Sequence, residues 1–185
     1  MADNHLAMGM GIKQRKKKRR AMAQQFLTRS GQPIDMDAVR ESAEKRGIQL
    51  LGIGRFIFEF SQLEFSIRAV LVSRLGLKEE YFNIVTGPYD FAKLCNVTRE
   101  ASIVKYPERK EELDKLFNAC LKLNETRVLV VHGMWLDDMD GLSLRIVSRG
   151  SFKTQTHSFK KDELTRHADK AQELMQRVIG FQGKK

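Results

Sequence analysis

The stretch from about Gln49 to Leu75 constrains the fold more than any other part of the chain. Its apolar residues recur at spacings of three and four: Ile53, Phe56, Ile57, Phe60, Leu63, Ile67, Val70 and Leu71. Residues three and four apart lie on one face of an α-helix, so the pattern predicts a long helix that buries a single stripe. Gly76 is expected to end this helix.

A short helix is expected before this one. The acidic residues Asp35 to Asp37 suit a helix start, and residues 36–46 are polar enough for an exposed helix. Gly47 is predicted to end it, because glycine is the commonest residue just past a helix C-terminus.

Start and stop signals place three more helices downstream. Asp90 can cap a helix from Phe91 to about Val104. Pro107 can open the next, which reaches Val131 before the stop at Gly133. The last helix is an amphipathic one from about Asp162 to Val178, with Leu164, Ala168, Ala171, Leu174 and Met175 among its apolar residues.

Between Gly133 and the last helix the apolar period changes from the helical one to alternation. Residues 142–148 alternate apolar with polar, Asp140-Gly141 favours a hairpin turn, and residues 152–159 follow after Gly150. Two or three short antiparallel strands are therefore expected. The sequence predicts a mainly α fold: a helical bundle with a small β-hairpin or β-sheet insertion before the last helix.

The chain has 185 residues, of which 42% are apolar, enough for one core and too few for two. We expect a flexible N-terminal arm over residues 1–34 and a single helical domain over residues 35–180. Much of the net charge of +10 lies in the arm, as a cluster of seven basic residues: Lys13, Arg15, Lys16, Lys17, Lys18, Arg19 and Arg20. Such a cluster can neutralise nucleic-acid phosphates, direct nuclear import or attract an anionic membrane surface. Phosphate neutralisation fits best with the chemistry below.

The two cysteines, Cys95 and Cys120, each lie in a helical pattern without metal-ligand spacing, which argues against a disulfide scaffold or a zinc site. No apolar run is long enough for a membrane span. A soluble, cytoplasmic protein with no metal or other cofactor is expected, without a membrane as partner.

The candidate site lies in residues 123–135, where Arg127 and His132 are five positions apart near the end of a helical segment. His132 is flanked by an apolar run, by Gly133 and by the only tryptophan, Trp135. Histidine can accept or donate a proton near neutral pH, and the arginine fork matches phosphate oxygens. The pair therefore suits phosphate chemistry, the alternative being a surface arginine and a histidine that caps the helix end.

Helix geometry limits how these two side chains can meet. Five residues of a regular α-helix turn through about 500°, which leaves the two side chains roughly 140° apart. Either the helix ends before His132, or a second subunit completes the site.

A long core helix that contains residues 58–64, two further helices, and then Arg127 four residues before His132 resembles the HEPN superfamily of small α-helical bundles. The similarity spans about residues 50–180. It implies a metal-independent endoribonuclease, in which the ribose 2′-hydroxyl attacks the neighbouring phosphate and leaves a 2′,3′-cyclic phosphate. It also implies RNA as substrate, a homodimer with a composite site, a toxin–antitoxin or phage-defence setting, and an antitoxin or regulatory protein as a possible partner.

The resemblance makes Arg127 and His132 the catalytic residues. Glu64 is a supporting candidate that could hold Arg127 in an ion pair or lie at the solvated edge of the apolar stripe. Asn124 could bind phosphate or lie on an exposed helical face. Active family members often have asparagine directly after the arginine, whereas this chain has Val128. That difference favours the alternative function, a non-catalytic module that dimerises and binds nucleic acid or a partner.

The other aromatic and histidine residues have simpler interpretations. Trp135 is expected to anchor the core between the bundle and the hairpin. His157 and His167 are expected to be solvated.

Overall fold

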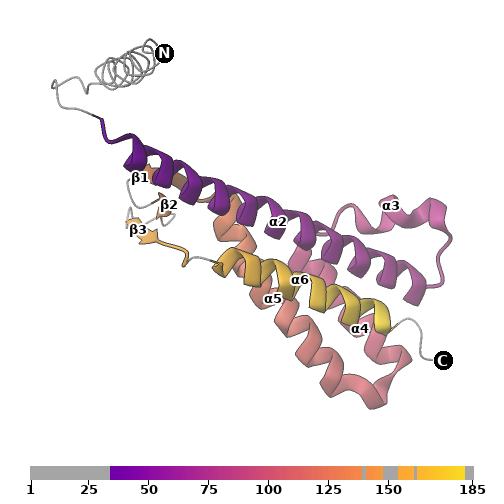
Figure 1. Ribbon diagram of the computed structural model, residues 1–185. Helices are drawn as coiled ribbons and strands as arrows, with labels where there is room; N and C mark the ends of the chain where they lie inside the picture. The colour runs from indigo at the N-terminus through magenta and orange to yellow at the C-terminus, as the bar shows by residue number, and fades with distance from the viewer. Residues whose placement is uncertain (1–33, 139–140, 148–153, 161, 182–185) are drawn as a thin grey trace, which may run out of the picture. The chain divides into compact units, whose positions relative to one another are not determined.

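The computed structural model describes residues 34–138, 141–147, 154–160 and 162–181 (Figure 1). The chain forms two compact units, residues 1–44 and 45–185. In the first unit, the Asp35 carboxylate caps the start of helix α2 (Met36–Arg74) by accepting hydrogen bonds from the backbone N–H groups of Asp37 and Ala38, at 3.0 and 3.2 Å. The basic cluster predicted to bind nucleic acid lies outside the described residues.

Helix α2 corrects one prediction, because residues 36–74 form a single helix and Gly47 lies inside it. A glycine within a helix costs only about 1 kcal/mol relative to alanine, whereas a second helix would need its own unfavourable first turn. The predicted apolar stripe is confirmed: Phe56, Leu63, Ile67 and Leu71 have no exposed surface.

The predicted end of α2 is also confirmed. Gly76 has a φ of +64°, and the Leu77 backbone N–H donates to the Val72 carbonyl at 3.1 Å, which closes the last turn. Two short elements follow that the pattern did not predict, a 3₁₀ turn η1 (Glu79–Tyr81) and helix α3 (Phe82–Thr86). The Arg68 guanidinium donates to the carbonyls of Thr86 and Tyr89 and so ties this segment to α2.

The next two helices form a hairpin in the places predicted. Helix α4 (Phe91–Lys105) is capped by Asp90, whose carboxylate accepts the Lys93 backbone N–H at 2.8 Å. A 3₁₀ turn η2 (Pro107–Arg109) leads into helix α5 (Lys110–His132). Cys95 and Cys120 are free thiols buried in this hairpin, and the hydrogen bond with Cys120, followed by burial, raises the pKa of Cys95.

Three antiparallel strands follow in the order β1 (Met134–Asp138), β2 (Gly141–Val147) and β3 (Thr154–His157). The register pairs Trp135 with Leu144, and Leu144 with His157. Directly paired residues lie on the same face of a sheet. Leu144 is fully buried, so this row faces the bundle. The sheet lies at the end of the bundle where α5 stops (Figure 1).

Helix α6 (Glu163–Gly180) completes the core. It buries Leu164, Ala168, Ala171, Leu174 and Val178 as predicted, with Met175 partly buried. Gly52 of α2 permits close contact, because a Cβ there would lie 3.3 Å from Leu164 Cβ. The fold class is therefore mainly helical with a small sheet before the last helix, as predicted. No helix within the described ranges combines the length and apolar character that crossing a lipid bilayer requires.

Candidate functional site

The segment that carries Arg127 and His132 is the last part of α5, and Gly133 is its first residue outside the helix. The Gly133 N–H donates to the Leu129 carbonyl at 2.9 Å, and its backbone is extended, with φ −76° and ψ 154°. Any residue can adopt this backbone conformation. Glycine is required by space, because a Cβ would lie 2.4 Å from Leu144 Cδ1 and 2.8 Å from the Leu129 carbonyl oxygen.

Helix α5 runs through His132, so the helix does not end early enough to turn that residue toward Arg127. The two side chains point in directions about 140° apart. Arg127 is half-buried on the side of α5 that faces α2, and its Cζ lies 5.9 Å from the centre of the Phe60 ring. His132 is exposed. Within one chain the helix thus directs the two motif residues to different sides.

Arg127 differs from the other half-buried arginines in what surrounds it. Arg68, Arg74, Arg99, Arg109 and Arg177 each lie beside a carboxylate or donate to a carbonyl. Among the residues that the structure describes, Arg127 has neither, and its one contact of this kind is the Phe60 ring. The described residues therefore supply no counter-charge to this half-buried guanidinium.

Glu64 does not supply this charge, and of its two alternatives the ion pair with Arg127 is not found. Glu64 Oε1 lies 2.5 Å from Arg68 Nη2, one helical turn further along α2, with the two side chains 27% and 19% exposed. Because Arg68 also donates to two backbone carbonyls, Glu64 serves to hold the α2–α3 connection. The i, i+4 spacing of Glu64 and Arg68 is the sequence signal that could have indicated this pair.

Asn124 lies one turn before Arg127 and is half-buried, which corrects the alternative that placed it on an exposed face. Its Oδ1 atom is buried without a hydrogen-bond partner in the described structure. Buried polar atoms are normally paired, so an unpaired one calls for a cause. An unpaired acceptor and an unpaired cation therefore lie one turn apart on α5.

Trp135 has the structural role that was expected. Its Nε1–H donates to the Val130 carbonyl at 3.0 Å, and its ring stacks on Phe159 with centroids 5.7 Å apart. The ring thereby joins the end of α5 to β1 and to the segment after β3.

His157 and His167 are both partly buried, which corrects the expectation that they are solvated. The His157 ring meets Phe159 edge-on at 4.5 Å, and the His167 ring lies 5.7 Å from Phe56. Burial lowers the pKa of His167, while Glu163, with Oε1 3.9 Å from Nε2, raises it by less. Lys160, Glu163, Arg166 and His167 line a shallow pocket there.

The part of the chain that the structure describes offers no metal site, because no three of its His, Cys, Asp or Glu side chains form a group that could hold an ion. Comparison of the chain with protein-family models, with curated proteins and with solved structures finds no match.

Proposed function

We propose that this protein is a metal-independent endoribonuclease, with Arg127 and His132 as its catalytic residues. The observation that carries the proposal is the half-buried Arg127 guanidinium, which has no acceptor among the described residues. A phosphodiester would supply the missing negative charge. The Asn124 Oδ1 atom is unpaired but buried, so it is not directly accessible to RNA.

The proposed reaction follows from these residue types. The ribose 2′-oxygen attacks phosphorus, its proton leaves, and the bond from phosphorus to the 5′-oxygen breaks. The products are a 2′,3′-cyclic phosphate and a 5′-hydroxyl, which takes up a proton. His132 accepts the first proton or donates the second, and Arg127 stabilises the negative charge that builds on the phosphate oxygens.

The site is proposed to be composite, with Arg127 from one chain and His132 from another. Both residues lie on one unbroken helix with side chains about 140° apart, so a single chain is poorly arranged to place both on one phosphate. The basic residues 13–20 would add contacts to RNA phosphates that do not depend on sequence. The proposed setting is a toxin or phage-defence system with a regulatory partner.

The test is a complementation assay on mixed RNA in the presence of a chelator. Arg127→Ala and His132→Ala are each expected to lower cleavage by about 10²–10⁴-fold. Arg177→Ala, which removes a half-buried arginine on α6, is the matched control and should cleave like the wild type.

An equal mixture of Arg127→Ala and His132→Ala should recover about one quarter of wild-type activity, because half of the dimers are mixed and each holds one complete site. Recovery in the mixture would support the composite site. Equal cleavage by all the proteins would refute the catalytic assignment, and loss in both variants without recovery would refute the sharing of the site.

A second function is favoured by Val128, which follows the motif arginine and is 40% exposed. An apolar residue there gives no polar support to the site. A dimeric module that binds nucleic acid without cutting it would bind RNA in an Arg127-dependent manner and leave it intact in the same assay.

A further inference from the structure

The outer face of α2 carries a stripe of largely exposed residues opposite its buried one. Within the second unit it consists of Gly47, Leu51, Gly54, Phe58, Ser61 and Phe65, which we call the outer stripe. At 100° per residue these six lie within an arc of about 80°, centred opposite the fully buried Phe56. Leu51, Phe58 and Phe65 are 75%, 61% and 59% exposed.

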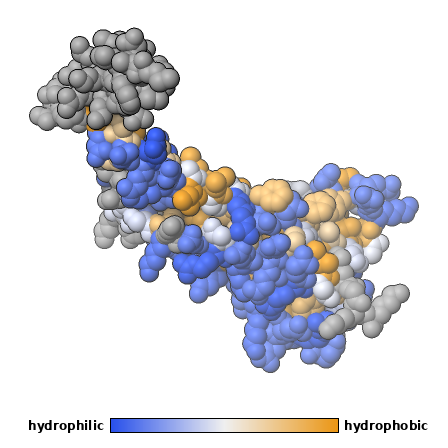
Figure 2. All heavy atoms as spheres, viewed as in Figure 1, coloured by the Kyte–Doolittle hydropathy of each residue, from blue (hydrophilic) through white to orange (hydrophobic). Residues whose placement is uncertain are grey.

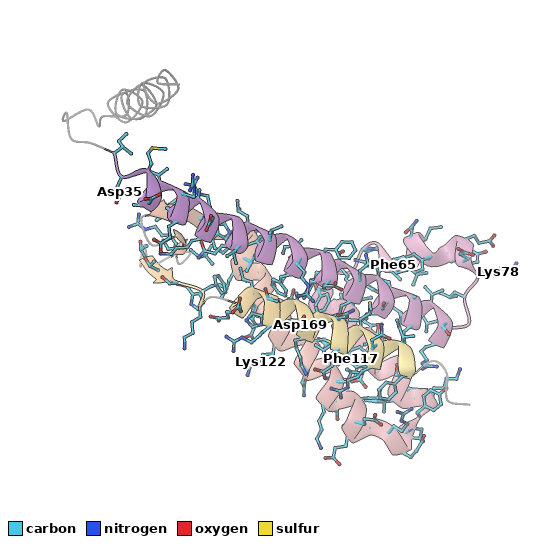
Figure 3. All side chains as sticks on the ribbon, in the orientation of Figure 1. Asp35, Phe65, Lys78, Phe117, Lys122 and Asp169 are labelled. Atoms are coloured by element: carbon cyan, nitrogen blue, oxygen red, sulfur yellow. The ribbon has the colours of Figure 1, made fainter. Side chains whose placement is uncertain are left out.

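The three large apolar side chains present roughly 300 Å² of surface, a patch size that is often functional. Figure 2 shows apolar residues along the upper edge of α2. Figure 3 places Phe65 on the side toward α3, and its ring lies 5.4 Å from Phe82 at the rim of a groove.

The glycines of the outer stripe are an independent observation. Apart from the helix's own backbone, no described atom lies within 4 Å of where a Cβ would stand at Gly47 or Gly54. Gly52, in contrast, is needed for the contact with Leu164. Each helical glycine costs about 1 kcal/mol relative to alanine. Nothing that the structure describes within the chain compensates for Gly47 and Gly54, so the space they leave points to something that packs against this face.

We propose that a second copy of this chain packs there, antiparallel to the first. Large and small residues alternate along the outer stripe at spacings of three and four. If the helices pair antiparallel with Phe58 opposite Gly54 of the partner subunit, then Leu51 lies opposite Ser61 of the partner subunit. In the same register Phe65 lies opposite Gly47 of the partner subunit. Every large side chain then meets a small one, which is the fit that close helix packing needs.

The edge of the outer stripe fits the same pairing. Arg55 is exposed, with its Nη2 2.6 Å from Asp169 Oδ1, and Glu59 forms no ion pair with any residue that the structure describes. In the proposed register Arg55 lies close to the level of Glu59 of the partner subunit, so opposite charges line one edge. The outer stripe thus complements a second copy of itself in two ways, in the alternation of large and small residues and in the positions of Arg55 and Glu59.

This pairing is separate from the composite site. Arg127 lies beside the buried Phe60, on the side of α2 away from the outer stripe, so the paired α2 helices would keep the two α5 helices apart.

The test is the dimer dissociation constant of the full chain, measured by sedimentation. The wild type should dimerise, and Phe58→Glu should raise the constant more than about tenfold. Val104→Glu, at an 85% exposed apolar residue of α4, is the matched control and should leave it unchanged. Gly54→Leu should weaken the dimer while leaving the fold of the chain intact, because its side chain meets open space.

Cysteine cross-linking tests the register. A mixture of Leu51→Cys and Ser61→Cys proteins should form a cross-linked dimer, whereas each alone should not, because like residues would be about 15 Å apart along the axis. The native cysteines are buried and do not interfere. Cross-linking of each variant with itself would indicate parallel helices and overturn the proposed register.

The outcomes separate this inference from the proposed function. A wild type that stays monomeric, or a Phe58→Glu variant that dimerises as well as Val104→Glu, would overturn the second copy and leave residues 1–33 or another protein to cover the stripe. A monomeric Phe58→Glu variant that still cleaves RNA would refute the composite site and leave the interface standing.

Discussion

At the scale of single residues, Arg127 is the half-buried arginine that has neither a carboxylate nor a carbonyl acceptor among the described residues. A cation that is half-buried without an acceptor lowers stability, because desolvation is not offset by an ion pair. Natural sequences keep such residues where function requires them. The chain's other half-buried arginines show the ordinary arrangement, as in the pair of Arg68 with Glu64.

Arg127→Met is therefore expected to keep or raise the free energy of unfolding, by up to about 1 kcal/mol, while it abolishes RNA cleavage and weakens RNA binding. Arg68→Met is the matched control and should lower stability, since it leaves Glu64 and two carbonyls without their donor. Urea unfolding measures both. An Arg127→Met protein less stable than Arg68→Met would show that Arg127 is a structural residue.

His167 predicts how stability depends on pH. Burial lowers its pKa below the ordinary value of 6.5 in the folded chain. As pH falls through 6.5, the unfolded chain binds a proton at His167 before the folded chain does. The contribution of His167 to the free energy of unfolding is therefore present above this pH and is lost below it. His167→Gln should reduce the loss of stability between about pH 7 and pH 5. Urea unfolding at the two pH values is the measurement.

At the scale of elements, three glycines of similar appearance in the sequence have different roles. Gly47 was predicted to end a helix and lies inside one, Gly76 ends α2 with a positive φ, and Gly133 leaves room for Leu144. The helix ends at Gly76 and at Gly133 follow from local pattern. The need for glycine at Gly133 depends on how close Leu144 comes, and spacing along the chain does not contain that information.

Gly133→Ala is expected to lower the free energy of unfolding by about 1–3 kcal/mol, because its Cβ would overlap Leu144 Cδ1 and the Leu129 carbonyl oxygen. Gly180→Ala, near the end of α6 with open space around the Cβ position, should be neutral or slightly stabilising. Thermal unfolding of the two variants gives the comparison. Equal stability would mean that the sheet can move away from α5 without cost.

At the scale of the whole molecule, the net charge of +10 predicts how RNA binding depends on salt. Deletion of residues 13–20 should weaken binding to single-stranded RNA and flatten its salt dependence, by about 0.7 in the log–log slope for each phosphate that the protein no longer neutralises. The weakening should be the same for unrelated RNA sequences. If the salt dependence of RNA binding is unchanged by the deletion, the basic cluster binds something other than RNA.

The sequence alone determined where most of the long helices lie, which face of each is buried, and where Asp90 and Gly76 bound them, because these depend on residues within one or two turns of each other. That Arg127 and His132 act as a chemical pair stays a prediction. Only the tertiary structure decided that Glu64 does not pair with Arg127, that Arg127 lacks an acceptor among the described residues, and that Gly54 faces open space. The physical reason is that the choice of partner depends on packing between segments far apart in the chain, where several side chains compete for the same neighbour.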